Sequence, residues 1–225
     1  MLDKGFYLMD CMDGMREFPD KFFELAIIDP PYRNSSENQP TKDMRRNGSM
    51  DSFGDKPTQE YFDELFRVSK NQIIWGANNF QLPSYKGFVV WKKLTISDNF
   101  TMSMAELAFI SEGLGTTSKI FEYAPQGTKN EPRLHPCQKP IALYLWLLQN
   151  YAKRGDKILD THVGSASSLI ACHRMGFEYW GMELDADYFQ AASERLEKEK
   201  SMQPLFSPEE IYKPQQQGLD FGDKE

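Results

Sequence analysis

The chain has 225 residues, of which 40% are hydrophobic and 13% aromatic, and its formal net charge is −7. This composition predicts one globular domain and excludes a disordered or fibrous chain. No apolar run is long enough to span a membrane and the first residues lack the pattern of a signal peptide, so we expect a cytoplasmic protein. The acidic charge argues against a protein that coats nucleic acid, although local basic clusters can still contact phosphates.

Short apolar runs alternate with amphipathic segments along the chain, which predicts an α/β protein with a doubly wound, mostly parallel sheet in a single domain. Strands are expected at residues 6–9, 23–29, 71–75, 88–91, 105–111, 157–160 and 179–184. A turn or short helix is expected at residues 13–18, and helices at 58–68, 140–152, 165–175 and 186–200. Residues 33–57 are polar and aperiodic, and loops of that length in compact domains are usually functional or disordered. Residues 201–225 are rich in proline, glutamine and charge, which predicts a flexible tail.

Four residues after the second predicted strand carry the clearest chemical signal: Asp29, Pro30, Pro31 and Tyr32. A residue before proline avoids the helical region, so Asp29 should be extended at the strand's end. The two prolines fix φ and lack N–H groups, which stiffens the loop and leaves carbonyl oxygens free as acceptors. Tyr32 adds a flat ring just beyond. The motif suits a flipped nucleobase whose exocyclic amine is held by a carboxylate and a carbonyl, although on four residues alone a plain proline turn is an equal alternative.

A second candidate site is a strand, a turn of small residues and a helix at residues 158–167. This arrangement presents free backbone N–H groups and the positive helix end at the strand's carboxyl edge, and Gly164 permits close approach of a ligand. Glu183 ends the next strand, 23 residues after Asp160. At about that spacing a carboxylate can accept hydrogen bonds from a ribose. Because G-x-G-x-x-G is missing, a small adenosyl ligand is favoured over a dinucleotide. An ordinary βαβ turn is the alternative.

The sequence offers no metal site, because neither histidines nor cysteines have the spacing of metal ligands. The histidines are His135, His162 and His173, and the cysteines are Cys11, Cys137 and Cys172. Reduced thiols are therefore expected.

Taken together, the motifs and their order resemble the β class of DNA amino-methyltransferases over residues 6–196. In this circularly permuted family the catalytic motif precedes the glycine loop, as Asp29-Pro30-Pro31-Tyr32 here precedes Gly164. Residues 135–140, H-P-C-Q-K-P, resemble the family's H-P-T-Q-K-P stretch, and Met9-Asp10-Cys11 resembles its acidic segment. The resemblance implies a Rossmann-like methyltransferase fold, S-adenosyl-L-methionine as methyl donor and no metal.

The resemblance also implies roles for individual residues. Asp29 and the Pro30 carbonyl would accept hydrogen bonds from the target amino group, with Pro31 in the same rigid turn, while Tyr32 stacks on the base. The residues implied for cofactor binding are Asp10 and Cys11 at the adenine, Glu183 at the ribose, and Gln138, Lys139, Asp160, Gly164 and Ser165 at the methionine end. One departure stands out: the family pattern D-P-F-x-G-S-G is D-T-H-V-G-S-A here, with His162 in place of an aromatic residue and Ala166 in place of a glycine.

The resemblance implies a DNA substrate and a modification enzyme of the restriction-modification type. In the family, aspartate at the first motif position favours adenine N6 and serine favours cytosine N4, so Asp29 favours adenine. Cytosine N4 methylation remains the alternative within the enzyme class. The substitutions at His162 and Ala166, with the acidic charge, keep open a non-catalytic nucleotide- or DNA-binding module of the same fold.

The methyltransferase domain is expected at residues 1–200, with residues 33–57 as a mobile loop near the catalytic motif and residues 92–133 as a candidate target-recognition region. The candidate DNA contacts are three basic residues within the loop 33–57, namely Lys42, Arg45 and Arg46. A homodimer is compatible with the family. In the tail, Q-P-L-F at residues 203–206 faintly resembles clamp-docking peptides, but a solvated tail is the preferred interpretation.

Overall fold

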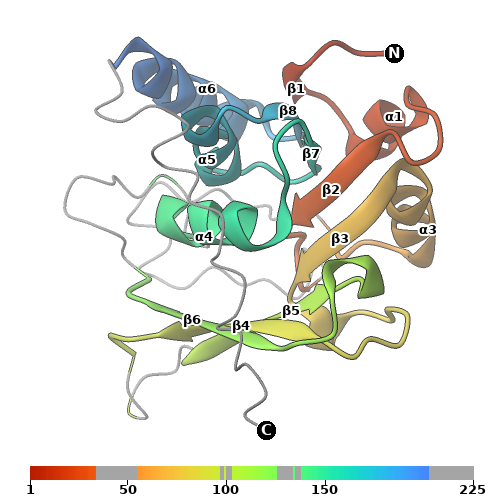
Figure 1. Ribbon diagram of the computed structural model, residues 1–225. Helices are drawn as coiled ribbons and strands as arrows, with labels where there is room; N and C mark the ends of the chain where they lie inside the picture. The colour runs from red at the N-terminus through yellow and green to blue at the C-terminus, as the bar shows by residue number, and fades with distance from the viewer. Residues whose placement is uncertain (34–54, 97–98, 100–102, 126–133, 135–137, 203–225) are drawn as a thin grey trace, which may run out of the picture.

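The computed structural model describes residues 1–33, 55–96, 99, 103–125, 134 and 138–202 (Figure 1). The described residues form one eight-stranded sheet in the order β1-β8-β7-β2-β3-β5-β4-β6. The strands are β1 (Gly5–Leu8), β2 (Phe23–Ile28), β3 (Ser69–Trp75), β4 (Phe88–Lys93), β5 (Ala105–Ile110), β6 (Lys119–Tyr123), β7 (Lys157–Asp160) and β8 (Glu178–Glu183). The helices are α1 (Cys11–Arg16), α3 (Gln59–Val68), α4 (Ile141–Tyr151), α5 (Ser167–Met175) and α6 (Ala186–Ser201), with short 3₁₀ turns η2 (Ala77–Asn79) and η3 (Glu112–Leu114). The predicted α/β class is therefore confirmed.

The sheet is parallel except at β5, which runs antiparallel to both of its neighbours. From β7 the chain crosses through α5 to β8 on one side, and from β2 it crosses through α3 to β3 on the other. The carboxyl ends of β7 and β2 therefore form the switch point of the sheet, where open α/β folds bind their ligands.

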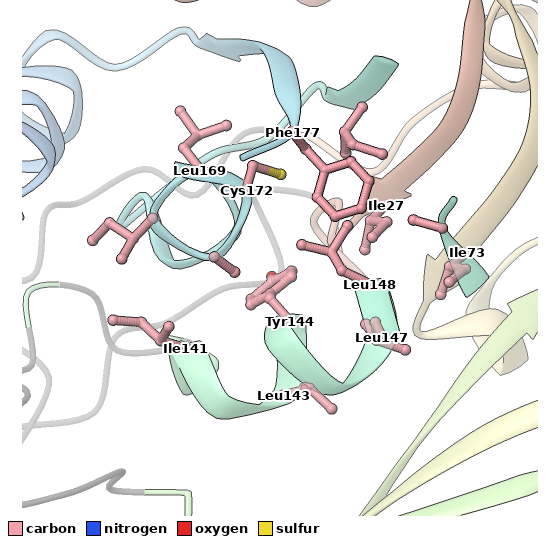
Figure 2. Close-up of a cluster of buried hydrophobic side chains, with 14 of the residues drawn as sticks. Ile27, Ile73, Ile141, Leu143, Tyr144, Leu147, Leu148, Leu169, Cys172 and Phe177 are labelled. Atoms are coloured by element: carbon pink, nitrogen blue, oxygen red, sulfur yellow. The ribbon is translucent and has the colours of Figure 1, made fainter. Parts of the chain in front are cut away.

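Helices cover both faces of the sheet, α1 and α3 on one side and α4, α5 and α6 on the other (Figure 1). Because successive side chains of a strand point to opposite faces, β2 serves both cores: Leu25 and Ile27 pack toward α4 and α5, while Ala26 and Ile28 pack toward α1 and α3. Figure 2 shows part of the first core, with Ile27 and Ile73 from the strands facing Leu147 and Leu148 of α4. Near-continuous apolar runs such as F-E-L-A-I-I are typical of strands that are covered on both faces.

The sequence prediction missed β6, which is an edge strand whose Ile120 is exposed while Phe121 is half-buried. An exposed isoleucine blurs the alternation that would mark a strand. The region 92–133, expected to recognise the target, contains β5 and β6 and so contributes to the sheet. Most of the predicted loop 33–57, with Lys42, Arg45 and Arg46, and nearly all of the tail 201–225 lie outside the described residues. In the part of the chain that the structure describes, no helix is both long and apolar enough to cross a membrane.

Candidate active site

Four neighbouring strands each carry an acidic residue at or just beyond the carboxyl end. Asp10 follows β1, Glu183 ends β8, Asp160 ends β7 and Asp29 follows β2. Strands β7 and β2 pair in parallel with Leu25 opposite Ile158. The structure thus brings the two motifs predicted from distant parts of the sequence to one edge of the sheet.

Asp160 is held inside the turn that follows β7. Its carboxylate accepts a hydrogen bond from the backbone N–H of His162 at 3.0 Å and another from the Ser168 hydroxyl. Burial raises the pKa of Asp160 to about 7, and these two hydrogen bonds only partly oppose the shift. The side chain therefore ties the turn to the start of α5.

Glu183 joins three segments at the same edge. Its carboxylate accepts the N–H of Gly164 at 2.8 Å and that of Asp185 at 3.0 Å, while its backbone carbonyl accepts the N–H of Met9 at 2.9 Å. A carboxylate offers about four acceptor positions, so it retains capacity for ligand hydroxyls. Leu184 beside it is 66% exposed, which provides apolar surface next to a polar rim.

The turn depends on two residues with left-handed backbone. Gly164 has φ +55° and Ala166 has φ +62°, and Ala166 is fully buried at the N-terminus of α5. A non-glycine residue in this region is strained by about 1–2 kcal/mol. The glycine of the resembled pattern is thus replaced by alanine at a position whose backbone favours glycine.

His162 takes the place of an aromatic residue as part of a wall. Its ring meets Tyr61 edge-on with centroids 5.4 Å apart, and its Nδ1 lies 2.9 Å from the Thr161 hydroxyl, which also pairs with Tyr61 at 2.6 Å. Burial lowers the pKa of His162 to about 4, so the ring is neutral near pH 7. A neutral planar ring can line an apolar pocket as an aromatic one does.

The remaining residues predicted for the cofactor are partly committed to the protein itself. Asp10 caps α1 by accepting the N–H of Met12 at 2.7 Å, and burial raises the pKa of the Cys11 thiol to about 12, so it stays protonated. The side-chain oxygen of Gln138 accepts the N–H of Leu134 at 2.9 Å. The Ser165 hydroxyl is buried, 3.2 Å from that of Ser167.

The side chains of Asp29 and Tyr32, from the motif after β2, contact each other and a lysine from a distant part of the chain. The Tyr32 hydroxyl donates to Asp29 Oδ1 at 2.6 Å, and the Lys139 ammonium lies 2.5 Å from Asp29 Oδ2. Burial raises the pKa of Asp29, and Lys139 opposes that shift. Lys139, expected at the cofactor's methionine end, therefore contacts the carboxylate of Asp29 directly.

Sequence reasoning missed two further members of this cluster. Glu106 of β5 contacts Lys139 at 2.9 Å and Lys93 of β4 at 2.5 Å. Burial opposes ionisation of Glu106, but the two lysines prevail and lower its pKa to about 2. In the sequence, Glu106 lies within one predicted strand and Lys93 just after another, and charged residues at such positions usually lie on a solvated face.

The donor set fits an adenosyl ligand. Carboxylates end the strands, the turn between them contains a glycine with left-handed backbone, and the exposed Leu184 can contact a flat ring. Among the described side chains, no group of three or more histidines, cysteines and carboxylates is arranged to hold a metal ion.

Comparisons with known proteins agree with this geometry. Residues 74–194 match a family model described as DNA methylase. The chain is 32% identical over 241 residues to the type II methyltransferase M.HpaI of Haemophilus parainfluenzae, covering 88% of this chain and 76% of the relative. The fold matches M1.HpyAVI, solved as a complex with SAM, with a TM-score of 0.57 at 18% identity over 84% of this chain and 98% of the other. It also matches the cytosine-N4-specific PvuII DNA methyltransferase, with a TM-score of 0.59 at 10% identity over 94% and 91% of the two chains. The chain therefore belongs to the DNA methylase family that modifies the exocyclic amino groups of adenine and cytosine.

Proposed function

We propose that this protein methylates the N6 amino group of adenine in DNA, with S-adenosyl-L-methionine as the methyl donor. The observation that carries the proposal is the position of Asp29 at the switch point of the sheet, one strand away from the turn at Gly164. Its half-buried carboxylate is held there by Tyr32 and Lys139. Aspartate at the first position of the motif supports adenine over cytosine.

The chemistry required of the chain is modest. When bound, S-adenosyl-L-methionine supplies a methyl group activated by a positively charged sulfur. The amino nitrogen of adenine is a poor nucleophile because its lone pair is delocalised into the ring. Hydrogen bonds from that amine to Asp29 and the Pro30 carbonyl favour a more tetrahedral nitrogen and direct its lone pair. Orientation of this kind converts a two-body reaction into an effectively unimolecular one, so no nucleophilic side chain is required.

Stacking on Tyr32 would partly offset the free energy needed to take the base out of the double helix. Extrusion costs a few kcal/mol, and stacking on an aromatic ring returns roughly 1–3 kcal/mol. The ring can therefore offset extrusion without driving it. Contacts to the DNA backbone must supply the rest, and we propose Lys42, Arg45 and Arg46 within the loop 33–57 for that role.

The cofactor roles follow the strand ends. We assign the adenine ring of the cofactor to the segment of Asp10 and Cys11, and its ribose to Glu183. The methionine end of the cofactor is assigned to the turn of Asp160, Gly164 and Ser165, with Gln138 nearby. Residues 1–200 would then form the methyltransferase domain.

The test is direct. The full chain is incubated with mixed-sequence DNA and methyl-labelled S-adenosyl-L-methionine, and the DNA is digested to nucleosides for mass spectrometry. Labelled N6-methyl-2′-deoxyadenosine supports the proposal, and N4-methyl-2′-deoxycytidine in its place overturns the base assignment. Cofactor binding in calorimetry without any labelled nucleoside would indicate a non-catalytic binding module. Sequencing of methylated bases in cells that express the chain then gives the recognition sequence.

A further inference from the structure

Two half-buried carboxylates and two buried lysines alternate in a row at the proposed catalytic motif. Asp29 contacts Lys139 at 2.5 Å, Lys139 contacts Glu106 at 2.9 Å, and Glu106 contacts Lys93 at 2.5 Å. The side chains of Lys139 and Lys93 are only 2% and 8% exposed, and those of Asp29 and Glu106 are 17% and 18% exposed. The four groups come from the ends of β2 and β4, from β5 and from the segment before α4.

A buried charge costs several kcal/mol unless an opposite charge and hydrogen bonds compensate it. In the proposed function the target base would cover the remaining exposed part of Asp29 and take its charge out of water. Lys139 supplies the opposite charge, and Glu106 shares Lys139 while Lys93 balances Glu106. The row as a whole carries no net charge, so it can be buried intact.

We propose that Lys139 and Glu106 are positioning residues for Asp29: Lys139 fixes the carboxylate at the end of β2, and Glu106 fixes Lys139. This inference rests on the proposed function, in which Asp29 accepts the target amino group. The amine binds to Asp29 only if that carboxylate is ionised and correctly turned. Glu106 gives Lys139 a second partner. The ammonium can therefore stay in place when the target amine also binds to Asp29.

The groups that face Asp29 come from several elements. The Tyr32 hydroxyl donates to Asp29 from the same loop, and Lys139 reaches it from the segment before α4. Tyr144 of α4, Glu106 of β5 and Asp160 of β7 also lie close enough to interact electrostatically with it. Lys139 stabilises the ionised form, whereas the charges of Glu106 and Asp160 disfavour it. Loss of Lys139 should therefore raise the pH at which Asp29 becomes active, and further loss of Glu106 should lower it again.

The experiment compares pH profiles of methyl transfer to DNA for the wild type, Lys139→Met and the double variant Lys139→Met with Glu106→Gln. We expect Lys139→Met to move the acid limb upward by about one pH unit or more, because an adjacent opposite charge shifts a carboxyl by about 1–3 units. In the double variant, the acid limb should lie between those of the wild type and Lys139→Met. The matched controls are Lys70→Met and Glu24→Gln. These two residues form an ion pair of 2.9 Å at the amino-terminal ends of β3 and β2, away from the site. Both variants should keep the acid limb of the wild-type pH profile.

A purely structural role would lower the rate equally at every pH, and such a parallel profile for Lys139→Met overturns the proposal. So does a double variant whose limb equals that of Lys139→Met. If the wild type transfers no methyl group to DNA, the proposed function fails before the variants are compared, so the two failures are distinguishable.

If Lys139→Met does not fold, Glu106→Gln alone still decides the matter. The carboxyl of Asp29 is titrated by ¹³C NMR in labelled protein without substrate and assigned with Asp29→Asn. The amide oxygen of glutamine can still accept a hydrogen bond from Lys139, so Glu106→Gln removes the repelling charge and keeps the ammonium in place, and the midpoint should be lower than in the wild type. Glu106→Ala also removes the oxygen that holds Lys139, so its midpoint should be higher than that of Glu106→Gln. An unchanged midpoint contradicts the proposed coupling.

Discussion

The ring of Tyr32 lies directly against Gly76, the residue that follows β3. A Cβ atom at Gly76 would lie 2.2 Å from Cε1 of Tyr32, far inside van der Waals contact, and the backbone there has φ +70°. The N–H of Gly76 donates to the Leu107 carbonyl at 2.9 Å, which fixes the turn against β5. The ring of Tyr32 can therefore occupy this position only because residue 76 is a glycine and has no Cβ atom.

Gly76→Ala should displace Tyr32 and reduce methyl transfer by about a hundredfold, since small misplacements at a reacting centre cost rates of that order. The matched control is Gly155→Ala, which has φ +88° and no atom within 4 Å of its added Cβ. Both variants incur backbone strain of about 1–2 kcal/mol, visible as a lower free energy of unfolding in urea. Only Gly76→Ala should lose activity. Equal activities would show that the packing against Tyr32 is irrelevant to the reaction.

Asp29→Ala should abolish methyl transfer while leaving the affinity for S-adenosyl-L-methionine nearly unchanged. The carboxylate contacts Tyr32 and Lys139, whereas the residues proposed for the ribose lie at the end of β8. Calorimetry measures the affinity and labelled methyl incorporation measures the rate. A variant with near-normal turnover would remove Asp29 from the reaction.

Tyr32→Phe should retain more activity than Tyr32→Ala, because stacking needs the ring. The structure adds a second role, since the hydroxyl donates to Asp29 at 2.6 Å. One hydrogen bond to a charged group contributes about 1.5–3 kcal/mol, so we expect a loss of about tenfold for phenylalanine and more than a hundredfold for alanine. If both variants lose the same activity in steady-state assays, the hydroxyl and not the ring is essential.

Much of the fold could be predicted from the sequence because its strands are short apolar runs between helices of the right length. The motifs could be placed at strand ends for the same reason, and the carboxyl ends of β7 and β2 did converge. The edge strand β6 was missed because Ile120 points into solvent, so the apolar positions do not alternate as burial requires.

Only part of the charged cluster around Asp29 could be predicted from the sequence. Glu106 and Lys93 lie far along the chain from Asp29, and a charge within a strand gives no sign of its partner until the sheet order is known. The resemblance implies that Lys139 lies at the cofactor, but a resemblance does not show which side chains of the protein the lysine contacts. Its contacts with Asp29 and Glu106 follow only from the tertiary structure.

Ala166→Gly should leave the protein as stable as the wild type or more stable by up to about 1 kcal/mol. Relief of the left-handed strain at φ +62° offsets the loss of a buried methyl group. Ala171→Gly is the matched control, because Ala171 is equally buried but lies within α5. Glycine there should destabilise by about 1 kcal/mol or more. Urea unfolding of the two variants measures the contrast, and equal destabilisation would contradict strain at Ala166.

Asp160 should make the stability of the cofactor-free protein depend on pH. Its pKa of about 7 in the folded state exceeds its ordinary value of 3.8, because burial favours the neutral acid. The stability that this group contributes is therefore complete below about pH 4 and is lost as the pH rises through 7. Asp160→Asn is neutral at every pH, and other groups cancel when it is compared with the wild type. The free energy of unfolding of the wild type minus that of Asp160→Asn should thus decrease between pH 4 and pH 8, by up to about 4 kcal/mol. A constant difference across that range in urea titrations would mean that Asp160 keeps an ordinary pKa, because the hydrogen bonds from His162 and Ser168 then outweigh its burial.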